Sequence, residues 1–193
     1  MRLVLIGPPG SGKGTQAHEL VKRLVGLTYI GTGDILRDAI ARGTEIGKQV
    51  EPILKQGRLV SDSVVNQVVA DLFHGPNRPE KFVTDGYPRT EAQAHAFDTL
   101  LRQEHLALTA VIHLTITDDE VVKRMLDRRR EDDHEEAIRQ RLRDFHATTD
   151  KLVEHYRKQG LVIDVPATGT KEEITANILK VLEDCETKKG GMR

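Results

Sequence analysis

The fold is decided by the segment Gly7-Pro8-Pro9-Gly10-Ser11-Gly12-Lys13-Gly14-Thr15. It lies between an apolar run at residues 2–6, typical of a buried strand, and a helical pattern at 15–25. Its Gly-x-x-x-x-Gly-Lys spacing in this context is that of a phosphate-binding loop. Glycines let backbone N–H groups wrap an anion, and the following helix turns its positive end toward that anion. We therefore expect this loop to hold phosphate groups, with Lys13 adding a positive charge.

The loop departs from the usual pattern at one position. The serine or threonine that usually follows the lysine is replaced by Gly14, and the hydroxyl comes one residue later, at Thr15. A glycine-rich turn with an incidental lysine is the alternative interpretation. The strand before the loop and the helix after it favour the phosphate loop.

Short apolar runs alternate with helical patterns along the whole chain. The runs are typical of strands and lie at 2–6, 27–30, 81–84, 109–116 and 161–165. Helical patterns lie at 15–25, 34–42, 44–56, 62–73, 90–104, after the capping box at 117–120, at 134–158 and at 171–183, with Ser61 and Asp62 as candidate caps. This alternation is typical of a parallel sheet with helices on both faces. We predict one α/β domain over 1–193, a three-layer P-loop NTPase fold with a central five-stranded parallel sheet.

Composition excludes several classes of protein. The 193 residues carry 29 Lys+Arg and 30 Asp+Glu, a net charge of −1, whereas a protein that binds polyanions over its whole surface is normally basic. The single cysteine, Cys185, excludes an intrachain disulfide and a four-cysteine zinc site. No run is long enough for a signal peptide or a membrane span. We expect a cytoplasmic protein with no nucleic-acid or membrane partner.

Three further motifs follow the loop in order, and together with it they resemble the adenylate kinases. The Gly-Lys-Gly-Thr form of the loop is usual in that family, so the family shares the departure at Gly14. The other motifs are Thr32-Gly33-Asp34-Ile35-Leu36-Arg37, Gly57-Arg58-Leu59-Val60, and Asp85-Gly86-Tyr87-Pro88-Arg89 with Gln93 four residues on. The resemblance spans about residues 1–183. It implies a nucleoside monophosphate kinase that catalyses ATP + AMP = 2 ADP, with Mg²⁺ carried as Mg-ATP.

Each motif also has a chemical interpretation. Arg37 and Arg89 can form paired hydrogen bonds with phosphate oxygens, although an exposed arginine such as Arg37 or Arg58 can also be a solvated surface residue. Asp85 ends an apolar strand, where it can hold waters around a phosphate-bound Mg²⁺. The amide of Gln93 can pair with the N6 and N1 edge of adenine.

The resemblance assigns residues to two nucleotides and two mobile segments. It implies a small helical monophosphate-binding subdomain at 32–61 and a minimal lid at 124–132. The residues implied for ATP are Gly10, Ser11, Gly12, Lys13, Gly14, Thr15, Arg124, Arg128 and Gly169. Those implied for AMP are Thr32, Arg37, Arg58, Leu59, Val60, Gly86, Tyr87, Pro88, Arg89, Gln93, Arg130 and Arg141. Those implied for the transfer itself are Lys13, Asp85, Arg89, Arg128, Arg130 and Arg141.

Seven of the 17 arginines fall within residues 124–143, around the expected lid. Some relatives insert about thirty residues here, sometimes with four zinc-binding cysteines, whereas this chain has only 127–131 between its flanking helices. We therefore expect no zinc, and the eight histidines show no metal-ligand spacing. Arg129, Arg139 and Arg143 have no counterpart in the resemblance, and we expect them to pair with Asp127, Glu135, Glu136 and Asp144.

Three alternatives are less well supported. A uridylate–cytidylate kinase usually carries a smaller residue at the position of Thr32 and an asparagine at that of Gln93. A kinase of another small metabolite would share the loop but not the segments 57–60 and 85–89. A nucleic-acid-binding module built on 124–143 is disfavoured by the seven acidic residues that lie among or beside these arginines, at 127–144. We expect a monomer that acts on ATP, AMP and ADP.

Overall fold

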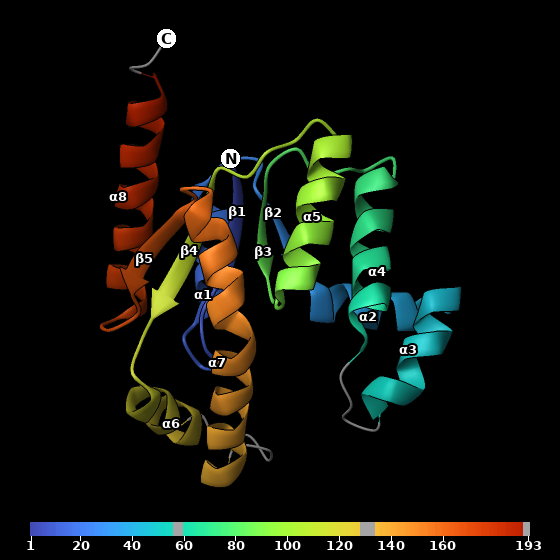
Figure 1. The fold of residues 1–193 in the computed structure, drawn as a ribbon, viewed down its shortest axis with the longest axis horizontal. Coiled ribbons are helices and arrows are strands. Elements are labelled where there is room, and N and C mark those ends of the chain that lie inside the picture. Colours follow the sequence, from blue (N-terminus) through green and yellow to red (C-terminus); the bar gives the residue numbers. More distant parts are fainter. Residues whose placement is uncertain (56–59, 128–133, 191–193) are drawn as a thin grey trace.

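A computed structural model describes residues 1–55, 60–127 and 134–190 of the chain (Figure 1). Within these ranges, five strands form one parallel sheet in the order β2-β3-β1-β4-β5. The strands are β1 (Arg2–Ile6), β2 (Thr28–Gly31), β3 (Phe82–Asp85), β4 (Ala110–Thr115) and β5 (Val162–Pro166). The predicted α/β fold is therefore confirmed, and each strand lies within about a residue of the predicted run.

Helices cover both faces of the sheet because successive residues of a strand point to opposite sides. Val4 and Ile6 of β1 pack into a buried cluster with α4, α5 and α7, whereas Leu3 and Leu5 pack into a second cluster with α1 and α8. In Figure 1, α7 crosses in front of the strands. The helices are α1 (Lys13–Arg23), α2 (Thr32–Ala41), α3 (Glu45–Lys55), α4 (Asp62–His74), α5 (Glu91–Gln103), α6 (Asp118–Asp127), α7 (Glu135–Lys158) and α8 (Lys171–Gly190).

The carboxyl ends of all the strands meet at one edge because the sheet is parallel. Leu5 of β1 lies in register with Asp85 of β3, which lies in register with Gly31 of β2. The segments that follow these three strands therefore emerge side by side. Figure 1 shows α2 and α3 on one side of this edge and α6 on the other. Ligands of open α/β sheets bind at the carboxyl ends of the strands, so this edge is where the predicted site residues should meet.

Two small apolar clusters lie outside the sheet core. One joins Leu36 of α2, Val50 of α3 and Val68 of α4, and the other joins α6 to the start of α7. Each is distinct from the two clusters that cover the sheet, although α4 contributes both to the first of them and to the sheet core.

The ends of three helices test the predicted caps. Ser61 occupies the N-cap of α4, as predicted, but its side chain makes no capping bond within the described residues. Asp62 is the first residue of the helix and accepts hydrogen bonds from Thr90 and Gln93, so it is not the cap. The hydroxyl of Thr117 does accept the Glu120 N–H, at 3.4 Å. The last helix continues past the predicted residue 183 to Gly190, because no helix breaker occurs before that glycine.

Among the residues that the structure describes, no helix combines the length and the apolar character that a membrane span requires.

Candidate active site at the carboxyl edge of the sheet

The loop between β1 and α1 adopts a backbone that requires glycine at two positions. Gly10 and Gly12 have φ angles of 79° and 93°, in the left-handed region, and Gly12 is the N-cap of α1. A Cβ on Gly10 would also lie 2.7 Å from Cγ of the buried Met125 of α6. The loop therefore packs closely against α6 while it leads into the N-terminus of α1, which favours an anion.

The side chain of Lys13 folds back over this loop. Its Nζ donates hydrogen bonds to the carbonyl oxygens of Gly7 at 2.7 Å and Pro8 at 2.9 Å. The pKa of the Lys13 ammonium is lowered to about 8, chiefly because the side chain is buried; the negative charge of Asp85 opposes this shift, and the positive charge of Arg89 adds to it. A phosphate bound at the loop would place negative charge beside the buried ammonium and so would favour its charged form.

Ser11 lies at the centre of the loop and is fully buried. Its hydroxyl has no hydrogen-bond partner within the described residues, and a Cβ on Gly7 would lie only 2.8 Å from it. A buried hydroxyl without a partner is unusual in a finished core, so the loop is suited to a polar ligand.

The structure gives a reason for the glycine that follows Lys13. A Cβ on Gly14 would lie 3.0 Å from Oδ2 of Asp85 at the end of β3, and Tyr29 donates a hydrogen bond to that same oxygen at 3.4 Å. The Asp85 carboxylate thus takes up space beside the loop that a larger side chain would need. Burial, together with the charges of Asp85 and Asp34, raises the pKa of the Tyr29 hydroxyl, so Tyr29 remains a donor.

Arg89 lies beside Asp85 on the segment that follows β3. Its Nε donates to the carbonyl oxygen of Gly86 at 2.8 Å, and its terminal nitrogens make no hydrogen bond to a described residue. The segment is fixed beneath it, because the buried Tyr87 hydroxyl donates to Asn66 at 2.8 Å. The guanidinium is therefore exposed, oriented and able to bind two oxygens of an anion.

The amide of Gln93 is buried and held on both sides. Its Oε1 accepts the backbone N–H of Arg89 at 2.7 Å, and its Nε2 donates to Oδ1 of Asp62 at 2.7 Å. The other oxygen of Asp62 accepts from Thr90 at 2.7 Å. An amide has two N–H groups and two acceptor lone pairs, so Gln93 keeps one of each for the adenine edge that the sequence predicts.

Thr32 and Arg37 follow β2 on α2. The Thr32 side chain is 5 % exposed and donates to the carbonyl oxygen of Gly86 at 3.2 Å, so it joins the ends of β2 and β3. Arg37 is exposed and pairs with Asp34. Val60 packs against the cluster of α2, α3 and α4. The predicted site residues Arg58 and Leu59 lie outside the described residues.

The arginines of the expected lid are only partly described. Arg124 of α6 donates to Glu120 at 2.9 Å, and Arg141 of α7 is half-buried and has a partner. Arg139 pairs with Glu135 at 2.8 Å, as predicted. Arg143 is exposed but donates to the amide oxygen of Gln140, and among the described residues it pairs with none of the four acidic residues named for this group. The amide nitrogen of Gln140 donates to Asp144 at 2.8 Å. Arg128, Arg129 and Arg130 lie outside the described residues.

Gly169 precedes α8 and has a φ of 105°, which glycine adopts without strain. A Cβ there would lie 2.7 Å from Oε2 of Glu173. Thr170 and Glu173 form a reciprocal capping box, since Glu173 accepts the Thr170 N–H at 2.8 Å and Thr170 accepts the Glu173 N–H at 3.2 Å. The sequence contained this Thr-x-x-Glu signal, but the prediction did not use it.

The chain matches the family model of adenylate kinase over residues 5–161. The chain belongs to the adenylate kinase family. It is 41 % identical over 192 residues to an adenylate kinase of Sinorhizobium medicae, which covers 94 % of this chain and 100 % of that relative. It is 42 % identical over 182 residues to one from Synechococcus sp. and 36 % identical over 214 residues to one from Archaeoglobus fulgidus. The alignment with the Synechococcus protein covers 94 % of this chain and 98 % of that relative, and the alignment with the Archaeoglobus protein covers 95 % of this chain and 98 % of that relative. The resemblance identified from the motifs is thereby confirmed, and the chain is a phosphotransferase.

Within this adenylate kinase, the structure brings most of the predicted residues to one edge. Lys13, Asp85 and Arg89 lie close enough to influence one another's charge, and Thr32 and Gln93 bond to the segment that carries Arg89. Asp62 and Tyr29 were missed. Neither belongs to a motif, and only the fold brings them to Gln93 and Asp85.

Proposed function

We propose that Lys13, Asp85 and Arg89 carry the transfer of the γ-phosphoryl group from Mg-ATP to AMP, the reaction of the adenylate kinases. The observation that supports it most is their proximity at the carboxyl edge of the sheet, with the terminal nitrogens of Arg89 unbonded to described residues. The acceptor is already an anion at neutral pH, so the reaction needs alignment and charge neutralisation more than a general base. Two cationic side chains facing one edge supply both.

We infer that ATP binds at the loop and its neighbours. Lys13 neutralises charge on the β- and γ-phosphates, and the backbone of the loop holds their oxygens. The Ser11 hydroxyl, which has no partner among the described residues, lies in the same loop. The residues proposed for ATP are Gly10, Ser11, Gly12, Lys13, Gly14, Thr15, Arg124, Arg128 and Gly169.

We infer that AMP binds on the other side of Arg89. The Gln93 amide reads the adenine with its remaining donor and acceptor, and Thr32 borders the same space because it bonds Gly86. Arg37 and Arg89 bind the phosphate as forked donors. The residues proposed for AMP are Thr32, Arg37, Arg58, Leu59, Val60, Gly86, Tyr87, Pro88, Arg89, Gln93, Arg130 and Arg141.

The residues present fit a Mg²⁺ ion carried on ATP. The Asp85 carboxylate, a hard oxygen donor, stands beside Gly14 of the phosphate loop, and Mg²⁺ prefers such oxygens together with phosphate and water. When bound, Mg²⁺ neutralises charge on the phosphate oxygens. Asp85 would hold it through waters, and Lys13 and Arg89 act on the oxygens that the ion leaves free.

We propose that 32–61 and 124–132 close over the two nucleotides as a monophosphate-binding subdomain and a short lid. Two apolar clusters support this, one joining α2 and α3 to α4 and the other joining α6 to the start of α7, because both are distinct from the clusters that cover the sheet. Closure excludes water, which would otherwise hydrolyse ATP. We further propose that the enzyme is a cytoplasmic monomer with ATP, AMP and ADP as its partners.

The substrate assignment is tested with a panel of acceptors. The enzyme is incubated with Mg-ATP and AMP, GMP, CMP or UMP, and kcat/KM is measured from the diphosphate formed. We expect the largest value for AMP, because Gln93 offers the donor and acceptor that adenine requires. A larger value for CMP or UMP would overturn the assignment and support a pyrimidine nucleotide kinase.

Nucleotide binding should take up a proton at alkaline pH. The pKa of Lys13 is about 8 in the free enzyme, and phosphate oxygens will raise it. At about pH 9, the Lys13 side chain is mostly neutral in the free enzyme and protonated in the enzyme with nucleotide bound. The affinity for ATP therefore falls as pH rises through 8. At about pH 6.5, Lys13 is protonated in both states, and binding takes up no proton. Calorimetry in buffers of different ionisation enthalpy measures the uptake. Equal proton uptake in Lys13→Met would contradict this origin.

Removing the Asp62 carboxylate should weaken AMP binding more than it slows catalysis. Asp62→Ala frees the Gln93 amide nitrogen, and one charge-assisted hydrogen bond corresponds to roughly 10- to 100-fold in KM for AMP. We expect little change in KM for ATP. Asp71→Ala is the matched control, since Asp71 lies on the same helix and bonds only the exposed Gln67 among described residues. An unchanged KM for AMP in Asp62→Ala would exclude this role.

A further inference from the structure

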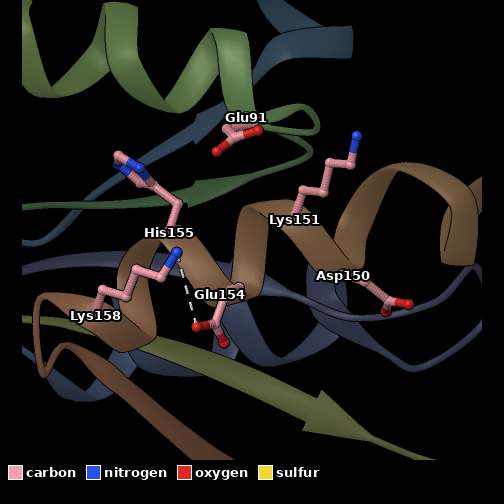
Figure 2. A pocket seen from close by; sticks show the side chains of 6 residues that line it. All are labelled: Glu91, Asp150, Lys151, Glu154, His155 and Lys158. Atoms are coloured by element: carbon pink, nitrogen blue, oxygen red, sulfur yellow. Dashed lines mark ion pairs between the residues drawn. The ribbon is translucent and has the colours of Figure 1, made fainter.

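Two histidines and a glutamate meet on the outer side of α5 and α7. Glu91 and His95 lie one turn apart on α5, and His155 lies on α7. Figure 2 shows the side chains of Glu91 and His155 on these two helices. One ligand atom from each of the three lies within 4.8 Å of the other two. None of the three is among the residues proposed to bind nucleotide.

A carboxylate lies behind the ring of His155. Its Nε2 lies 2.7 Å from Oδ2 of Asp98 and 2.9 Å from Nε2 of Gln159, and the side chain is only 11 % exposed. In the tautomer that donates from Nε2 to that carboxylate, Nδ1 carries the lone pair. A carboxylate behind a histidine is the usual outer support of a metal site, because it fixes the tautomer and makes the ring a stronger ligand. Gln159 donates to the same Asp98 oxygen at 3.0 Å and helps to hold it.

The surroundings carry a charge suited to a cation. The shallow pocket beside His155 is lined by Glu91, Asp150, Lys151, Glu154 and Lys158 (Figure 2). Counted with Asp98, the four carboxylates outnumber the two lysines, and Lys158 pairs with Glu154 at 4.0 Å. This excess of negative charge would help to offset the cost of bringing a divalent ion to the site.

We propose that Glu91, His95 and His155 bind one divalent transition metal ion of the zinc type. Two imidazoles and one carboxylate are ligands that Zn²⁺, Co²⁺ and Ni²⁺ accept, with water in the remaining position, whereas Mg²⁺ prefers oxygen donors. Glu91 and His95 are exposed, so rotation of their side chains can close the 4.8 Å spread around one ion without moving the backbone. The ion would join α5 to α7 and so stabilise the face of the sheet that both helices cover.

The site could not be found from the sequence because 60 positions separate His95 from His155. Spacing analysis detects ligands that share one helix or loop. These come from two helices that only the packing on the sheet brings together.

The site is tested on nucleotide-free full-length enzyme after removal of all metals. Equilibrium dialysis against Co²⁺ should give one ion per chain, with the visible absorption of a bound Co²⁺ ion. In a thermal melt, free Zn²⁺ at about 100-fold its Kd should raise Tm by roughly 5–10 °C, and Mg²⁺ should not. EDTA should reverse the shift.

Variants locate the ion. His95→Ala and Glu91→Gln should each abolish the Zn²⁺-dependent rise in Tm while leaving the metal-free Tm close to that of the parent, because both side chains are exposed. His146→Ala and Cys185→Ser are the matched controls and should keep it. Absence of stoichiometric Co²⁺ binding, or a full Tm shift in His95→Ala, would overturn the proposal.

Discussion

Arg89→Ala should lower kcat by roughly 10³- to 10⁵-fold, the range found for arginines that contact a transferring phosphoryl group. Among the described residues, the guanidinium makes one hydrogen bond, from Nε to the Gly86 carbonyl, and the exposed side chain lies at the edge where Lys13 also lies. We therefore expect it to act on substrate and not on the fold. Initial rates of ADP formation with saturating Mg-ATP and AMP measure the effect.

Two further variants test whether a loss of kcat comes from the charge and the paired donors of Arg89 or from a disturbed fold. Arg89→Lys keeps the charge but loses the paired donors, so its kcat should lie between those of the parent and the alanine variant. Arg102 is an exposed arginine of α5, and among the described residues its side chain bonds only Asp98 and Thr99. Arg102→Ala should therefore leave kcat unchanged. A kcat of Arg89→Ala within about tenfold of the parent would exclude the proposed role, given the range above.

Removal of divalent metal should abolish turnover. In the proposed site, the Asp85 carboxylate adds a negative charge beside the loop that holds the phosphates, and a divalent cation would offset the repulsion between them. We expect no ADP above background after treatment with EDTA, and full recovery when Mg²⁺ alone is returned. Recovery with Mg²⁺ alone separates this requirement from the site at Glu91 and His155, which does not favour Mg²⁺.

The same experiment can be applied to Asp85. Asp85→Asn keeps the shape of the side chain and removes its charge, so the Mg²⁺ concentration that gives half-maximal rate should rise. Full activity of the parent enzyme without any divalent ion would contradict the assignment of Mg²⁺.

The sequence predicts the sheet well because its signals are local. The apolar run at 2–6 and the loop after it are each recognisable within a few residues, and β1 and the loop lie where predicted. The apolar patterns of the strand and the helix and the glycines of the loop between them all predict the same fold, so several independent signals support it.

Contacts between distant segments could not be predicted in the same way. Asp62 is 31 positions from Gln93, and its place before a helical pattern predicted a helix cap. In the fold, its carboxylate accepts a hydrogen bond from the Gln93 amide instead. The contact of Gly14 with Asp85 likewise depends on how β1 and β3 pair. The period of a segment indicates which of its faces is buried, but not which residue of another segment lies against that face.

The central claim, that this site moves a phosphoryl group from ATP to AMP, is tested most directly by the stoichiometry of the reaction. The nucleotides are followed together, by ³¹P NMR or chromatography, in mixtures of Mg-ATP with and without AMP. We expect two ADP for each AMP consumed, and almost no ATP loss when AMP is absent. ADP formed equally fast without AMP, or no ADP formed with it, would rule out phosphoryl transfer from ATP to AMP.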